Sequence, residues 1–220
     1  MVVHYHGGFW RNRFDLLHAG HVCAALTAAG IVTANVEYRR VGDEGGGFPG
    51  TLDDAAAALQ FARAQAARFS CSARTVVTGH SAGGHLALWL SAEDPGLAGV
   101  VALAPVACLR QAWELNLGNG AVQDFLQSTP TGAPDRYTSA CPAQRPASVP
   151  RVLIHGSADE IVPIAVSRRY FDERTTDPGP VRLLELPGAD HFDVIDPDSA
   201  PWTNVLDTVT VLLRLDISND

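Results

Sequence analysis

Ser81 lies in the motif Gly-His-Ser-Ala-Gly at residues 79–83, between an apolar run at 75–78 and a helical run at 85–90. A strand that ends at Gly-x-Ser-x-Gly and turns directly into a helix forms a nucleophile elbow, which holds the serine on a sharp, strained turn. Side chains in place of the two glycines would clash with the neighbouring strand or helix. The motif therefore predicts an exposed hydroxyl that could attack a carbonyl carbon.

A serine hydroxyl needs a base to take its proton and an acid to orient that base. After an elbow, these partners are expected in the order Ser, Asp or Glu, His. Asp159 follows an apolar run at 151–155, and His191 follows another at 181–186. Because the carboxyl ends of parallel strands meet at one edge of a sheet, both side chains are predicted to lie near Ser81.

Other polar residues compete for these roles. Glu160 adjoins Asp159 but is interpreted as a surface charge, and Asp190 belongs to the histidine's own loop, too late in the expected order. His4 and His6 resemble a His-x-His metal pair, but no carboxylate or cysteine cluster accompanies them. Packed or hydrogen-bonded strand histidines are the favoured interpretation, and no metal site is predicted.

The intermediate of acyl transfer carries an oxyanion that needs preorganised donors. The backbone N–H of Ala82, directly after the serine, is one candidate. The loop His-Gly-Gly-Phe-Trp at residues 6–10 supplies the others, because glycines let backbone amides approach a substrate closely. We predict Gly8 and Phe9 as these donors.

Composition limits the classes of partner. The formal net charge of -8 argues against nucleic acid and against an anionic membrane surface. No apolar run reaches membrane-spanning length, and no signal sequence begins the chain, so a cytoplasmic protein is expected. The four cysteines are far apart and are predicted to be free thiols.

Apolar runs alternate with helical runs throughout the 220 residues, which predicts a single α/β domain. About six strands are expected, at 2–5, 31–36, 75–78, 99–103, 151–155 and 181–186. Because several runs are continuously apolar, the sheet should be mostly parallel, with helices on both faces. Residues 108–149 interrupt this alternation of apolar and helical runs, and we interpret them as an irregular, cap-like insertion over the site.

Together, the His-Gly-Gly-x-Trp loop, the Gly-His-Ser-Ala-Gly-Gly-His motif and the Asp-His-Phe-Asp stretch resemble the α/β-hydrolases, in the esterase/lipase branch related to kynurenine formamidases (arylformamidases). The resemblance implies a Ser81–Asp159–His191 triad. It also implies that Trp10 lies beside an aromatic substrate, and we expect Phe192 in the same pocket. Members usually have leading strands before the His-Gly-Gly strand, whereas only a few residues precede it here, which indicates that two leading antiparallel strands are missing. We therefore expect either a homodimer through the 31–36 edge or a start site placed too late.

The expected function is a serine hydrolase that cleaves a small-molecule ester or amide through an acyl-enzyme, with no cofactor. An arylformamidase and a carboxylesterase both fit the motifs. A non-catalytic binding or scaffold protein on the same fold is the alternative from a different class.

Overall fold

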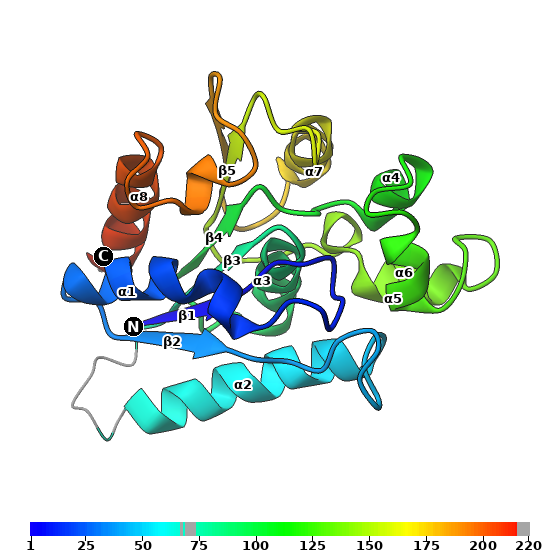
Figure 1. Ribbon diagram of the computed structural model, residues 1–220, viewed down its shortest axis with the longest axis horizontal. Coiled ribbons are helices and arrows are strands. Elements are labelled where there is room, and N and C mark those ends of the chain that lie inside the picture. Colours follow the sequence, from blue (N-terminus) through cyan, green and yellow to red (C-terminus); the bar gives the residue numbers. More distant parts are fainter. Residues whose placement is uncertain (67, 69–73, 215–220) are drawn as a thin grey trace.

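The computed structural model describes residues 1–66, 68 and 74–214 and shows one six-stranded sheet in the order β2-β1-β3-β4-β5-β6 (Figure 1). Its strands are β1 (Val2–Tyr5), β2 (Thr33–Val36), β3 (Val76–His80), β4 (Gly99–Leu103), β5 (Arg151–Gly156) and β6 (Val181–Leu186). Every pairing is parallel, as in Val2↔Val76 and Val76↔Gly99. The predicted mostly parallel sheet of six strands is therefore confirmed.

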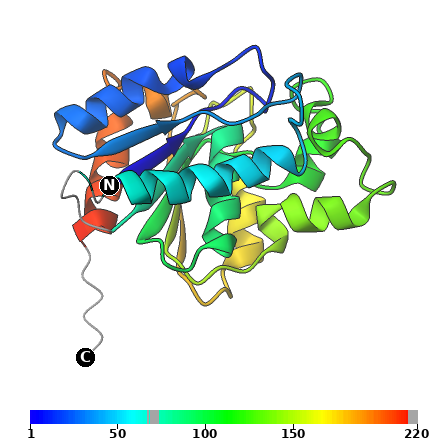
Figure 2. The ribbon, with the colours of Figure 1, turned by 90° about the horizontal axis from the view of Figure 1, so that it is seen from below.

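The continuously apolar strands are buried on both faces. Successive strand residues point to opposite sides, so Val2 and Val76 pack in one core while Val3 and Val77 pack in the other. The first core is covered by α1 (Gly20–Ala28) and α8 (Trp202–Arg214). The second is covered by α2 (Gly50–Ala66), α3 (Ala82–Glu93) and α7 (Ala165–Arg174), and Figure 2 shows α1 and α2 on opposite sides of the strands.

The segment 108–149 is more regular than its sequence indicates. It contains α4 (Leu109–Glu114), α5 (Ala121–Leu126), α6 (Pro134–Ala140) and the 3-10 helix η3 (Pro142–Gln144), and the three α-helices lie together at one side of the molecule (Figure 1). Each is only six or seven residues long. Helices of this length show too few turns for a clear hydrophobic period, which explains why the sequence reads as irregular.

Two 3-10 turns and one glycine-rich loop connect the main elements. The 3-10 turn η1 (Leu16–Ala19) leads directly into α1, and a second one, η4 (Asp193–Ile195), follows the predicted histidine. The glycine-rich loop at 37–50 is held by an ion pair from Arg39 to Asp54, with an N–O distance of 2.7 Å. Thr51 lies within α2 and donates its hydroxyl hydrogen to the Arg39 carbonyl.

Cys23, Cys108 and Cys141 are free thiols, as predicted, and Cys71 lies outside the described residues. In residues 1–66, 68 and 74–214, no helix combines the length and apolar character needed to cross a membrane.

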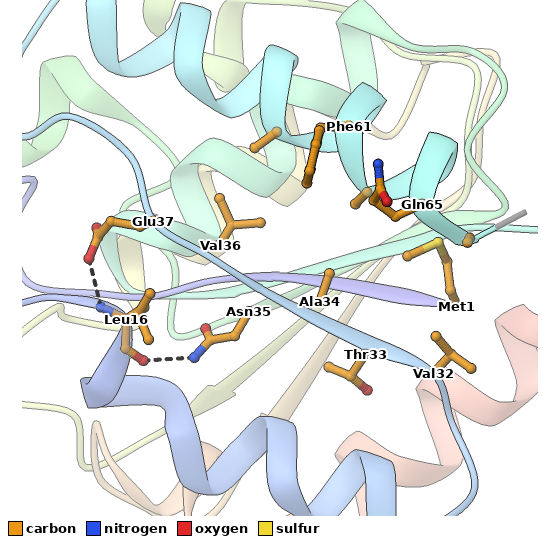
Figure 3. Close-up of a pocket in the computed structure, with 13 residues that line it drawn as sticks. Met1, Leu16, Val32, Thr33, Ala34, Asn35, Val36, Glu37, Phe61 and Gln65 are labelled. Atoms are coloured by element: carbon orange, nitrogen blue, oxygen red, sulfur yellow. Dashed lines mark hydrogen bonds between the residues drawn. The ribbon is translucent and has the colours of Figure 1, made fainter. Parts of the chain in front are cut away.

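Beside the edge strand β2 lies a cavity of about 410 Å³ between that strand and α2 (Figure 3). Val36 and the exposed Phe61 line it, and the Asn35 side chain donates to the Leu16 carbonyl at its border. None of the predicted catalytic residues lines this cavity.

Candidate active site

Ser81 occupies a sharp turn between β3 and α3. Its backbone angles are φ 55° and ψ -116°, in the left-handed half of conformational space that costs a residue with a Cβ energy. A Cβ on Gly79 would overlap the Gly83 carbonyl, and one on Gly83 would overlap the Tyr5 carbonyl. The two glycines therefore let β1, the turn and α3 approach one another closely enough to form the elbow.

Asp159 and His191 meet from different strand ends. Asp159 follows β5 and His191 follows β6, and the His191 Nδ1 lies 2.6 Å from the Asp159 Oδ2. The other carboxylate oxygen accepts the backbone N–H groups of Ile161, at 2.9 Å, and Val162, at 2.8 Å. When Nδ1 donates to this carboxylate, Nε2 of the neutral imidazole is left as the proton acceptor.

Burial raises the pKa of Asp159, but hydrogen bonds from His155 and His191 and the backbone donation of Val162 outweigh it and hold that pKa well below its usual range. The carboxylate is therefore ionised at neutral pH. His155 contributes through its Nε2, which lies 3.1 Å from the Asp159 Oδ2.

Ser81 and His191 line one pocket of about 160 Å³. The remaining lining residues are Gly8, Phe9, Arg13, Phe14, His18, His80, Ile161 and Phe192. The structure thus places the predicted Phe192 at this pocket, where it is 46% exposed. No residue of the segment 108–149 belongs to the lining, although that segment was expected to cover the site.

Two of the predicted oxyanion donors, Gly8 and Phe9, line the same pocket as Ser81, and the third, Ala82, directly follows Ser81 in the chain. Gly8 and Phe9 have φ angles of 113° and 53°, and within the described residues their backbone N–H groups donate to no other group. Ala82 is the first residue of α3, where backbone N–H groups have no partner inside the helix. Among the described residues, the backbone N–H groups of Gly8, Phe9 and Ala82 therefore have no hydrogen-bond partner.

Trp10 takes a different position from the one the resemblance implies. It is fully buried, its ring stacks on Phe125 with centroids 4.6 Å apart, and its indole N–H donates to His85 Nδ1 at 3.2 Å. It does not line the pocket of Ser81. Trp10 is corrected from a substrate contact to a core residue that joins the first loop to α5.

Two histidines near the site were given no role from the sequence. His80 donates its Nε2 proton to the His191 carbonyl at 2.9 Å, and the two rings lie 4.5 Å apart. Burial, followed by the nearby His191, lowers the pKa of His80 well below its ordinary value, so the ring is neutral. His18 also lines the pocket. Only tertiary packing reveals these contacts.

The remaining candidate metal pair has ordinary partners. His4 Nδ1 lies 2.8 Å from the Thr78 hydroxyl, and His6 Nε2 lies 2.8 Å from a Glu37 oxygen. In the part of the chain that the structure describes, no group of three or more His, Cys, Asp or Glu side chains could hold a metal ion.

Comparison with known proteins identifies similar chains. The family model described as BD-FAE matches residues 1–97, less than half of the chain. Esterase LipC of Mycobacterium tuberculosis (strain ATCC 25618 / H37Rv) is 29% identical over 212 residues, covering 86% of this chain and 52% of LipC. The chain therefore spans about half the length of that curated relative.

Two solved esterase structures share the architecture. Esterase Est2 of Thermogutta terrifontis with propionate bound gives a TM-score of 0.74 at 22% identity, covering 96% of this chain and 81% of that one. An acetyl ester-xyloside bifunctional hydrolase from Caldicellulosiruptor lactoaceticus gives 0.78 at 22% identity, covering 94% and 79%. The chain thus has the α/β-hydrolase fold and is similar in sequence and structure to esterases.

Proposed function

We propose that this chain is a serine hydrolase that cleaves a small carboxylic ester through an acyl-enzyme. The observation that supports it most is one pocket lined by Ser81 and His191, with the His191 Nδ1 2.6 Å from an ionised Asp159. Nucleophile, base and orienting acid then follow the chain order and geometry expected of a catalytic triad.

In the first half of the reaction, the Ser81 hydroxyl attacks the ester carbonyl while His191 Nε2 takes the hydroxyl proton. The oxyanion that forms is stabilised by the N–H groups of Gly8, Phe9 and Ala82, and Asp159 stabilises the imidazolium. The carbon–oxygen bond to the alcohol then breaks, and His191 gives its proton to the leaving alcohol. In the second half, His191 activates a water that releases the acid and restores the serine.

The size of the pocket favours a short acyl group. A space of about 160 Å³ fits a few carbon atoms beside the serine, much less than a drug-sized ligand fills. Est2 carries bound propionate, and the Caldicellulosiruptor enzyme is described as acting on an acetyl ester. Trp10 is buried in the core, and no tryptophan is among the described residues that line this pocket and could contact an aromatic substrate.

An aryl formamide is the second candidate substrate. Formyl is the smallest acyl group, so it also fits the pocket, and the half-exposed Phe192 presents an aromatic ring at its lining. Both candidates use the same triad and differ only in the bond that breaks.

The test compares hydrolysis of p-nitrophenyl acetate, butyrate and octanoate with that of N-formyl-L-kynurenine. We expect the two short esters to exceed the octanoate in kcat/KM by about tenfold or more, because the longer chain does not fit. Ser81→Ala should lower kcat by about 10⁴-fold while leaving the circular dichroism spectrum unchanged.

Each result decides between named alternatives. A strong preference for the formamide would establish the second candidate. Equal rates for Ser81→Ala and the parent protein would exclude Ser81 as the nucleophile. A folded parent protein that hydrolyses none of the four compounds would favour the non-catalytic binding protein.

A further inference from the structure

Arg13 is the only permanently charged side chain among the residues that line the Ser81 pocket. It is exposed, and in the described part of the chain no carboxylate forms an ion pair with it. The other three arginines of residues 1–50 each pair with a carboxylate: Arg11 with Asp124 at 2.8 Å, Arg39 with Asp54 at 2.7 Å and Arg40 with Asp43 at 3.2 Å. Within residues 1–66, 68 and 74–214, Arg13 is thus the one of these four arginines whose guanidinium donates no hydrogen bond.

The loop that carries Arg13 is firmly held on both sides of it. The Asn12 N–H donates to the Val41 carbonyl at 3.1 Å, and the Phe14 carbonyl accepts from Arg40 at 2.6 Å. The guanidinium itself lies over the Phe14 ring, 4.8 Å from the centroid, in a cation–π contact. Because Phe14 also lines the pocket, this contact keeps the positive charge beside the pocket.

Nothing else on the pocket lining offsets this charge. No Asp or Glu belongs to the lining, and the nearby His18 and His80 are neutral at pH 7 because burial lowers the pKa of each. The protein as a whole carries a formal net charge of -8, so the unpaired cation beside the nucleophile has the opposite sign to the net charge. An unpaired guanidinium in this setting suits a carboxylate, which it can bind through two parallel hydrogen bonds.

We propose that the substrate is a short-chain acyl ester whose alcohol part carries a carboxylate, and that Arg13 binds this carboxylate. This inference rests on the proposed esterase function. The acyl group takes the small space beside Ser81, and the alcohol part extends toward solvent. Because Arg13 both lines this pocket and is exposed, its guanidinium is available to the alcohol part. Arg13 is thus a specificity-determining residue that favours anionic esters over neutral esters of the same size.

The experiment uses a matched pair of acetyl esters, 4-acetoxybenzoate and its neutral analogue 4-acetoxybenzamide. The measured quantity is the ratio of their kcat/KM values, in which differences in enzyme concentration cancel. We expect Arg13→Gln to lower this ratio roughly fivefold to tenfold, through a higher KM for the anionic ester. Arg13→Lys keeps the charge but not the two parallel N–H donors, so it should retain only part of the ratio. Added salt should reduce the ratio because the site is exposed.

Arg168→Gln is the control, because it removes the same charge from an exposed position on α7 outside the pocket. It should leave the ratio unchanged, which separates a local contact from an effect of net charge. An unchanged ratio in an active Arg13→Gln protein overturns the assignment of Arg13 and leaves the esterase function standing. Absence of Ser81-dependent hydrolysis of both esters overturns the esterase function and this inference together.

Discussion

At the scale of single residues, the Asp159 carboxylate accepts hydrogen bonds from several groups besides His191, the histidine that it orients. Its carboxylate accepts four hydrogen bonds, from the side chains of His155 and His191 and from the backbone of Ile161 and Val162. A buried carboxylate with all these donors has a single favoured orientation and stays ionised. The position of His191 therefore depends on groups that never contact the substrate.

His155 is the side chain through which this dependence can be measured. Its Nε2 lies between the Asp159 carboxylate, at 3.1 Å, and the Val162 carbonyl, at 2.8 Å, and its Nδ1 lies 2.7 Å from the Ser167 hydroxyl. We expect His155→Leu to lower kcat about tenfold, because Asp159 loses a charge-assisted hydrogen bond, with little change in KM. Steady-state kinetics on p-nitrophenyl acetate measures both constants.

His155→Gln is the matched variant, because its amide keeps a donor directed toward Asp159. Its kcat should recover toward that of the parent protein. Equal losses of kcat in the Leu and Gln variants, both still folded by thermal denaturation, would show that the hydrogen bond to Asp159 does not position the base.

The contrast between Asp159 and Trp10 shows what could be predicted for individual residues. Asp159 and His191 stand directly after apolar strands, and the ends of parallel strands share one edge, so local sequence indicated where they lie. Trp10 follows Phe9, and both residues have positive φ, which turns the indole toward Phe125 in a distant segment. No local pattern shows that partner, and the same holds for the unpaired charge of Arg13.

At the scale of elements, the elbow depends on close approach between β1 and α3. A methyl group on Gly83 would overlap the backbone carbonyl oxygens of Tyr5 and His6, which belong to β1 and the loop after it. Because these atoms are backbone, they cannot rotate away, and the strand and the helix would have to separate.

We predict that Gly83→Ala lowers the free energy of unfolding by about 3 kcal/mol, at the upper end of the usual cost of overpacking. Gly20→Ala is the control, because Gly20 also lies at the start of a helix and a methyl group there meets no atom within 4 Å. It should raise stability by about 0.5 kcal/mol by restricting the unfolded chain. Urea denaturation measures both, and equal stabilities of the two variants would contradict the packing argument.

The elements of the sheet could be predicted better than the helices of the segment 108–149. Six runs, several of them continuously apolar, indicated a mostly parallel sheet of six strands, and three of these runs, at 2–5, 99–103 and 181–186, match β1, β4 and β6 residue for residue. In contrast, α4, α5 and α6 complete fewer than two turns each and are stabilised by packing rather than by their own pattern.

At the scale of the whole molecule, the two apolar cores bury several histidines in their neutral form. His85 donates its Nε2 proton to the Ala140 carbonyl at 2.9 Å and accepts the Trp10 indole N–H on Nδ1. Burial, against the opposing effect of the Ala140 hydrogen bond, lowers the pKa of His85 to about 4, and burial lowers that of His4 to about 3. Protonating either ring would place a charge in the core without a counterion.

These lowered pKa values predict how stability depends on pH. An unfolded histidine binds its proton near pH 6.5, whereas folded His85 does so only near pH 4. Between these values the unfolded chain holds more protons, so acidification stabilises the unfolded state. Each such histidine should lower the free energy of unfolding by about 1.4 kcal/mol per pH unit, or about 3 kcal/mol for His85 over the whole window.

Urea denaturation at pH 7.5, 6.5, 5.5 and 4.5 measures how the free energy of unfolding changes with pH. Two variants then show which histidine causes this slope. His85→Gln keeps a donor for Ala140 and an acceptor for Trp10 but does not titrate. The slope below pH 6.5 should therefore become smaller by the contribution of one buried histidine. His21 is exposed, and His21→Gln should therefore leave the slope as it is in the parent protein. If His85→Gln and His21→Gln gave equal slopes, the buried ring of His85 could not be the group that the acid titrates. The acid sensitivity would then have to come from groups outside the core between α3 and the segment 108–149.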